Sequence, residues 1–87
     1  MDLIAYKIDN FGKLAFAVEC KKYSKLNKVG RPAIQKFLGA ISLKNVTGGI
    51  FITTSYFTKD AFEFIQPISN KIYLNDYDDL TSVLDKK

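Results

Sequence analysis

The first fifth of the chain alternates between apolar and polar positions in a way that predicts a β-hairpin. Residues 2–9 and residues 13–21 each show the period of two that is typical of half-buried strands. Between them, Asn10-Phe11-Gly12 supplies residue types that tolerate the backbone angles of tight turns. The two strands are therefore expected to pair antiparallel.

The pattern then changes to the period of a helix. Residues 31 to about 43 carry apolar side chains at the spacing of one buried helix face, and Pro32 stands at or near the first helical position. A turn and a short apolar run over residues 50–54 follow, which is typical of a central strand in a parallel pairing. Strand, helix and strand together predict a β-α-β unit. The apolar positions of the helix are Ile34, Phe37, Leu38 and Ile41.

The last third predicts two more helices around a short strand. Thr58 is a candidate N-cap for a helix that Pro67 ends, and residues 71–74 form a β-rich run. Asp76 and Asp79 have the spacing of a capping box that opens a terminal helix. The side chains expected to be buried in these two helices are Ala61, Phe62, Ile65, Leu80, Val83 and Leu84.

Composition narrows the class of protein. A chain of 87 residues with 47% hydrophobic residues supports one α/β domain, residues 1–87, with a small core. No run is long enough to cross a membrane and Met1-Asp2 leads directly into a strand, so a cytoplasmic protein is expected. With no histidine and one cysteine, the chain cannot build Cys/His zinc sites, histidine acid/base catalysis or an internal disulfide. Cys20 is expected to be a buried, inert thiol.

Positive charge is concentrated in the middle of the chain. The net charge is +4, but residues 20–59 hold eight cationic side chains and no acid, while the flanking residues are acidic overall. A basic block of this kind favours a polyanionic partner, with nucleic acid and an ordinary solvated face as the two alternatives. The DNA-binding candidates are Lys22, Lys25, Lys28 and Arg31.

The end of the second strand carries candidate chemistry. Side chains alternate across a strand, so Glu19 and Lys21 share one face and Cys20 lies on the other. A carboxylate and an ammonium held side by side can bind a divalent cation and stabilise an anionic transition state. If the hairpin turn centres on residues 10–12, paired positions sum to 21–23, and the odd sums place Asp2 on the face of Glu19. The alternative is a solvated strand end.

Several separate segments carry a resemblance to a known family. The chain resembles the catalytic domain of Mrr-type restriction endonucleases, within the PD-(D/E)xK nuclease superfamily. The similarity covers nearly the whole chain, and its blocks occur in the family's order. These blocks are Asp2-Leu3-Ile4-Ala5, Glu19-Cys20-Lys21-Lys22-Tyr23, Val29-Gly30-Arg31-Pro32 before a helix with Gln35 and Leu38-Gly39-Ala40, and residues 49–58 followed by Ala61 and Phe64.

This resemblance implies a restriction-endonuclease-like mixed sheet flanked by helices and a metal-dependent DNA endonuclease. Asp2, Glu19 and the backbone carbonyl of Cys20 are then expected to bind Mg²⁺ or Mn²⁺. Lys21 is expected to orient the attacking water or offset charge on the phosphorus, and Gln35 to hold the water or the phosphate.

One departure from the family leaves alternatives open. Family members usually carry a helix and a strand before the segment equivalent to Asp2, so this chain is expected to be an N-terminally truncated form with one sheet face uncovered. A homodimer or a partner chain could cover that face. The alternative function is a catalytically degenerate DNA-binding or assembly module on the same fold.

Overall fold

The computed structural model describes residues 3–9 and 13–85 as one four-stranded mixed sheet with helices on both sides of it. The strands lie in the order β1 (Leu3–Asp9), β2 (Lys13–Lys21), β3 (Gly48–Thr53) and β4 (Ile72–Asn75). The helices are α1 (Arg31–Ser42), α2 (Lys59–Ile65) and α3 (Tyr77–Asp85), and a 3₁₀ turn (Gln66–Ile68) follows α2. The predicted fold class is therefore confirmed.

The hairpin and the β-α-β unit form as the sequence predicts. Strands β1 and β2 pair antiparallel, and β2 and β3 pair parallel across the connection through α1. Strand β4 adds a second parallel pairing on the far side of β3. In β1 and β2, paired positions sum to 22, which sets Leu3 opposite Glu19. From Phe16 to Glu19, strand β2 thus has a paired strand on each side.

The helices take their places for local reasons that the sequence shows. Pro32 lies in the first turn of α1, and the Thr58 hydroxyl caps α2 by accepting from the Ala61 N–H at 3.2 Å. Asp76 and Asp79 form the predicted capping box, each carboxylate accepting from the other residue's N–H. Of the helices described here, none is long and apolar enough to cross a membrane.

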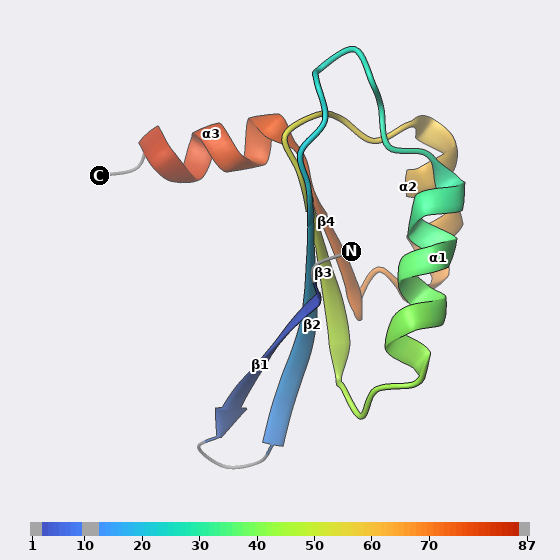
Figure 1. The fold of residues 1–87 in the computed structure, drawn as a ribbon, viewed down its shortest axis with the longest axis vertical. Coiled ribbons are helices and arrows are strands. Elements are labelled where there is room, and N and C mark those ends of the chain that lie inside the picture. Colours follow the sequence, from blue (N-terminus) through green and yellow to red (C-terminus); the bar gives the residue numbers. More distant parts are fainter. Residues whose placement is uncertain (1–2, 10–12, 86–87) are drawn as a thin grey trace.

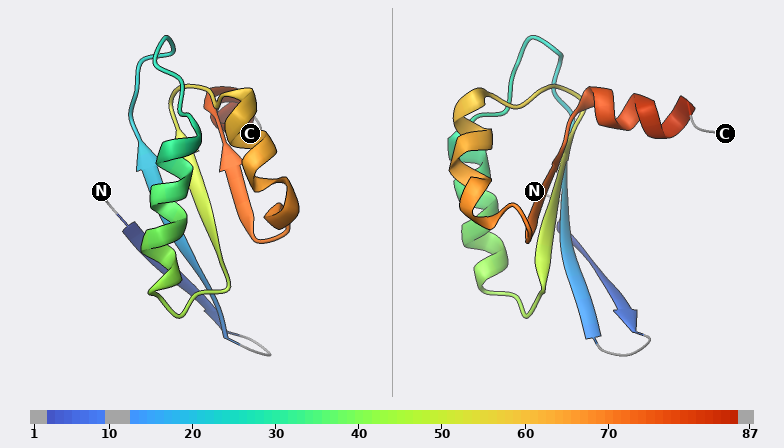
Figure 2. Two further views of the ribbon diagram at one scale, coloured as in Figure 1. Left: turned by 90° about the vertical axis from the view of Figure 1, so that its right-hand side faces the viewer. Right: turned by 180° about the vertical axis from the view of Figure 1, so that it is seen from behind.

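Helices α1 and α2 cover one face of the sheet, and α3 projects from its edge on the opposite side (Figures 1 and 2). The core lies between the sheet and the two covering helices, where Phe51 stacks edge-on with Phe37 and Phe57. Strand β3 and helix α1 approach closely here: a Cβ at Gly49 would lie 2.8 Å from the Phe37 ring and 3.1 Å from Ile41, so a side chain would fit there only if these core side chains moved.

The opposite face of the sheet has no comparable cover, and two predictions fail because of it. Cys20 is exposed, since it alternates onto this open face beyond the last buried residue of β2. Val83 and Leu84 of α3 are each 70% exposed because α3 projects away from the core that the sequence expected it to join. The prediction of a buried thiol and the prediction of a buried α3 stripe are both wrong. Phe62 is also exposed, although its ring still contacts Phe57.

Candidate metal and nuclease site

Glu19 lies in the middle of the sheet, on the face that α1 covers. Its Cα partners are Leu3 on β1 and Phe51 on β3, and Phe51 belongs to the fully buried core. The side chain of Glu19 is only 1% exposed. Its Oε1 atom has no hydrogen-bond partner within residues 3–9 and 13–85. A buried carboxylate oxygen without a partner is energetically costly, so the residue needs a ligand or a proton.

Two opposite effects act on the pKa of the Glu19 carboxyl. Burial raises the pKa of the Glu19 carboxyl above its ordinary value near 4.5, because removal from water penalises the charged form. The ammonium groups of Lys21 and Lys36 act in the opposite direction and favour the carboxylate. A divalent cation at the unpartnered oxygen would act in the same direction as these lysines.

The donor set fits a hard cation in part. Carboxylate and carbonyl oxygens are the ligands that Mg²⁺ prefers, and Mg²⁺ keeps several water ligands of its own. The Glu19 carboxylate and the adjacent Cys20 carbonyl can supply two oxygen ligands. Asp2, the second predicted carboxylate, lies outside the described residues. The hairpin register that the structure describes is the even one, so the odd register that was expected to place Asp2 on the face of Glu19 is wrong. In the described part of the chain, no three acidic, histidine or cysteine side chains form a group that could hold a metal ion.

Lys21 and Gln35 take different positions relative to Glu19. Lys21 shares the face of Glu19, two residues further along β2, and pairs with Thr53 of β3. Gln35 is exposed on α1, on the stripe of that helix that also carries Arg31 and Leu38. Since Arg31 contacts Phe64 of α2, this stripe faces α2 and not β2.

The exposed Lys36 carries a charge that acts on Glu19 and that the sequence did not single out. It lies on the α1 stripe with Ala33, Phe37 and Ala40, on the other side of the helix from Gln35. This is the side from which its charge reaches Glu19. The helical periodicity contained this signal, but only the packing of α1 across β2 shows which stripe faces the carboxylate.

Thr54 is a second residue whose role was missed. Its hydroxyl accepts from the Tyr23 N–H at 3.0 Å and donates to the Tyr23 carbonyl at 2.8 Å, and its own N–H donates to the Lys21 carbonyl. These bonds attach the end of β2 to the end of β3. Thr54 therefore holds the backbone on which Lys21 stands.

The four predicted DNA-binding residues lie on exposed surface near this strand end. Lys22, Lys25 and Lys28 are exposed on the loop that follows β2, and Arg31 opens α1. Two of them stack on aromatic rings: the Lys25 Nζ atom lies 3.8 Å from the centroid of Tyr77, and the Arg31 guanidinium 4.6 Å from that of Phe64. The basic surface is thus continuous with the strand end that carries Lys21.

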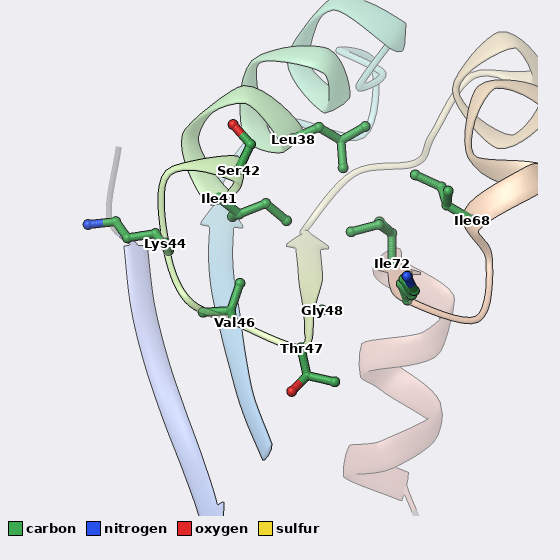
Figure 3. Close-up of a pocket in the computed structure, with 10 residues that line it drawn as sticks. Leu38, Ile41, Ser42, Lys44, Val46, Thr47, Gly48, Ile68 and Ile72 are labelled. Atoms are coloured by element: carbon green, nitrogen blue, oxygen red, sulfur yellow. The ribbon is translucent and has the colours of Figure 1, made fainter. Parts of the chain in front are cut away.

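A hollow at the opposite end of the sheet is not part of this site. It has a volume of about 350 Å³ and lies at the start of β3, beside the last turn of α1 (Figure 3). Its lining is mainly aliphatic, with Lys44 and Lys71 at the rim, and it includes no carboxylate. It offers none of the oxygen ligands that a hard metal ion requires. The aliphatic residues that line it are Leu38, Ile41, Val46, Ile68 and Ile72.

Comparison with known proteins agrees with this geometry. The model of the Mrr catalytic-domain family, described as restriction endonuclease, matches residues 1–84. The chain belongs to this restriction endonuclease family. It is 35% identical over 68 residues to the type IV methyl-directed restriction enzyme EcoKMrr of Escherichia coli K12, a match that covers 78% of this chain and 22% of that protein. It is 41% identical over 59 residues to the uncharacterized protein y4cE of Sinorhizobium fredii, covering 67% of this chain and 15% of that protein.

A solved structure confirms the fold. The DNA modification-dependent restriction endonuclease AspBHI superposes with a TM-score of 0.77 at 24% identity, over 92% of this chain and 21% of that one. The chain therefore spans less than a quarter of the length of each of these three proteins. What they share with it is one domain.

The raised pKa of Glu19 predicts how stability depends on pH. The folded protein binds the Glu19 carboxyl proton more tightly than the unfolded chain does. This contribution to the stability of the fold is fully present below the ordinary pKa near 4.5 and is lost as pH rises through the raised pKa. At pH 7 without divalent ions, Glu19→Gln should therefore raise the melting temperature, because the neutral amide removes the cost of burying the charged carboxylate. The difference should disappear below pH 4.

The matched control is Glu63→Gln, since Glu63 is exposed on α2 and should leave the melting temperature unchanged. Mn²⁺ should stabilise the parent at pH 7 and not Glu19→Gln, because a ligand stabilises the state that binds it. One result would contradict this account: a parent whose melting temperature does not change with Mn²⁺ and is higher than that of Glu19→Gln at pH 7. The Glu19 carboxylate would then already have a partner within the protein.

Proposed function

We propose that this chain is the catalytic domain of a metal-dependent DNA endonuclease of the Mrr restriction type, which hydrolyses phosphodiester bonds. Membership of the restriction endonuclease family supports the reaction class. The observation that carries the proposal is the buried, unpartnered Oε1 atom of Glu19 beside Lys21. A cytoplasmic location remains a prediction from the sequence.

The proposed roles of Glu19 and Lys21 follow from their shared face on β2, and that of Asp2 rests on the family resemblance alone. Glu19, the Cys20 carbonyl and Asp2 would hold Mg²⁺ or Mn²⁺, which when bound polarises the scissile phosphate and lowers the pKa of water. Lys21 directs its ammonium toward the attacking water or the charge that develops on the phosphate. Lys36 adds a second cation on the α1 side. The predicted role of Gln35 in holding water or phosphate stays a prediction.

The proposed substrate is DNA. Lys22 and Lys28, with Lys25 and Arg31 stacked beside them, would contact phosphates and release counterions, so affinity should fall steeply with salt. The names of EcoKMrr and AspBHI describe enzymes directed by DNA methylation or modification. We carry over only the substrate class that they share, because the chain matches about a fifth of either protein.

A second candidate function is a DNA-binding or assembly module that has lost catalysis. It is favoured by one observation: among the described residues, no three acidic, histidine or cysteine side chains come together as a group that could hold a metal ion. Both candidates predict DNA binding, and only metal-dependent cleavage separates them.

Two substitutions test the catalytic proposal. Lys21→Ala should abolish nicking of plasmid DNA but leave Mn²⁺ binding, measured by calorimetry, largely intact, because Lys21 is not a ligand. Glu19→Ala should remove both, because it takes away a ligand. If Lys21→Ala cuts as fast as the parent, the role given to Lys21 is wrong. If the parent neither binds a divalent ion nor cuts DNA, the binding module is the correct function.

We also propose that the protein is a homodimer. The open sheet face exposes part of Phe16, Ile50, Ile52 and Tyr73, and α3 projects on that same side with its own exposed apolar residues. In a two-fold pair, α3 of each protomer can cover the open sheet face of the other. The apolar side of α3 and the open sheet face would thus bury each other's exposed apolar side chains.

Light scattering tests the assembly directly. The parent should have the mass of a dimer, and Val83→Asp should convert it to a monomer, because it places a charge in the proposed interface. The matched control is Leu43→Asp, at an exposed residue just beyond α1, which should remain dimeric. A parent that is monomeric at high protein concentration contradicts the proposal.

A further inference from the structure

The loop between β2 and α1 has a defined shape. It runs from Lys22 to Lys28 and contains a turn in which the Asn27 N–H donates to the Ser24 carbonyl at 2.9 Å. Lys25 and Leu26 occupy the two central positions of that turn. Leu26 is therefore at the tip of the loop, with a lysine before it and another two residues after it.

Both ends of the loop are attached to the segment that follows β3. Thr54 bonds both backbone polar groups of Tyr23, and the Ser55 hydroxyl donates to the Asn27 carbonyl at 2.8 Å. Near the tip, the ammonium of Lys25 lies over the Tyr77 ring. The turn is thus held at each end and beside its tip, which limits the ways in which Leu26 could fold back onto the protein.

Leu26 is nonetheless 93% exposed, the highest value among the described large apolar side chains. A single exposed leucine carries no message by itself. Leu43 is the residue to compare with Leu26, because its side chain is 88% exposed as well. It lies just beyond α1, at the end of the molecule opposite the loop (Figure 1). What distinguishes Leu26 is its setting: an anchored turn, lysines on both sides, and the same strand end as Lys21.

The charge of this loop favours a polyanionic partner. Lys22 and Lys28 flank the turn as exposed cations that can contact phosphates, and DNA-binding proteins commonly combine such cations with an apolar side chain that inserts at a base step. Resting on the proposed function, we propose that Leu26 is a wedge that enters a groove of duplex DNA and partly unstacks one base step while the flanking lysines contact the backbone. The loop then sets where the duplex lies relative to Glu19 and Lys21.

Binding measurements with the full chain separate the wedge from the phosphate contacts. In EDTA, which prevents cleavage, Leu26→Ala should bind a short mixed-sequence duplex on the order of 10-fold more weakly, as expected for the loss of one buried leucine contact. The slope of affinity against salt should not change, because no charge is lost. Lys28→Ala should instead reduce that slope by about one unit. Leu43→Ala should match the parent in both.

Unstacking supplies an independent readout. A set of duplexes, each with 2-aminopurine at a different position, should give increased fluorescence with the parent and with Leu43→Ala, and little increase with Leu26→Ala. Leu26 is exposed, so its loss should not affect folding, which circular dichroism checks.

The outcomes are distinct from those of the catalytic proposal. If Leu26→Ala equals Leu43→Ala in affinity and fluorescence, the wedge is wrong, whether or not the parent cuts DNA. If the parent binds no duplex, the wedge is also wrong. If Leu26→Ala loses affinity and fluorescence but the parent never cuts DNA with any divalent ion, the wedge stands and the nuclease assignment falls.

Discussion

The burial of one carboxylate is the constraint on which the account depends. Glu19 is buried between the sheet and the helices, next to Phe51, and its Oε1 atom has no hydrogen-bond partner among residues 3–9 and 13–85. An isolated buried charge is strongly unfavourable, so proteins pair it, protonate it or use it to bind metal. Here the nearby cations Lys21 and Lys36 reduce the cost only in part, since burial still dominates the pKa of Glu19. The structure thus holds a buried carboxylate oxygen at a strand position that is paired on both sides.

The segment after β3 connects this carboxylate to the proposed DNA surface. Thr54 holds the end of β2, Ser55 holds the far end of the basic loop, and Thr58 caps α2. These three contacts come from residues 54–58. They therefore fix the strand end, the loop and the covering helix α2 relative to one another. Catalytic geometry on rigid strands, with contacts to the substrate from an anchored loop, is a general arrangement for positioning reactive groups.

The parts of the fold that the sequence predicted are those that local patterns determine. The period of two in residues 13–21, the proline at the start of α1 and the paired Asp76 and Asp79 each specify an element without reference to the rest of the chain. Glu19 and Lys21 were found in the same way, because alternation along β2 decides which side chains share a face.

The misses concern what covers each face. Alternation separates Cys20 from Glu19, but it cannot say which of the two faces the helices will take, so the exposed thiol was predicted to be buried. The apolar side of α3 was placed in the core for the same reason, although the helix projects away from it. Lys36 and Thr54 act on residues far away in the sequence, across α1 and β3, and only the tertiary arrangement brings them to β2.

The most direct test of the account locates the metal. Crystals of the protein grown with Mn²⁺ and duplex DNA, measured at a wavelength where manganese scatters anomalously, should show a peak about 2.1–2.2 Å from Glu19 Oε1, within coordination distance of a phosphate oxygen. Lys21 should lie beside the metal without contacting it. Crystals with ordered DNA on the basic loop but no anomalous peak at Glu19, or with the metal bound elsewhere, would contradict the central claim.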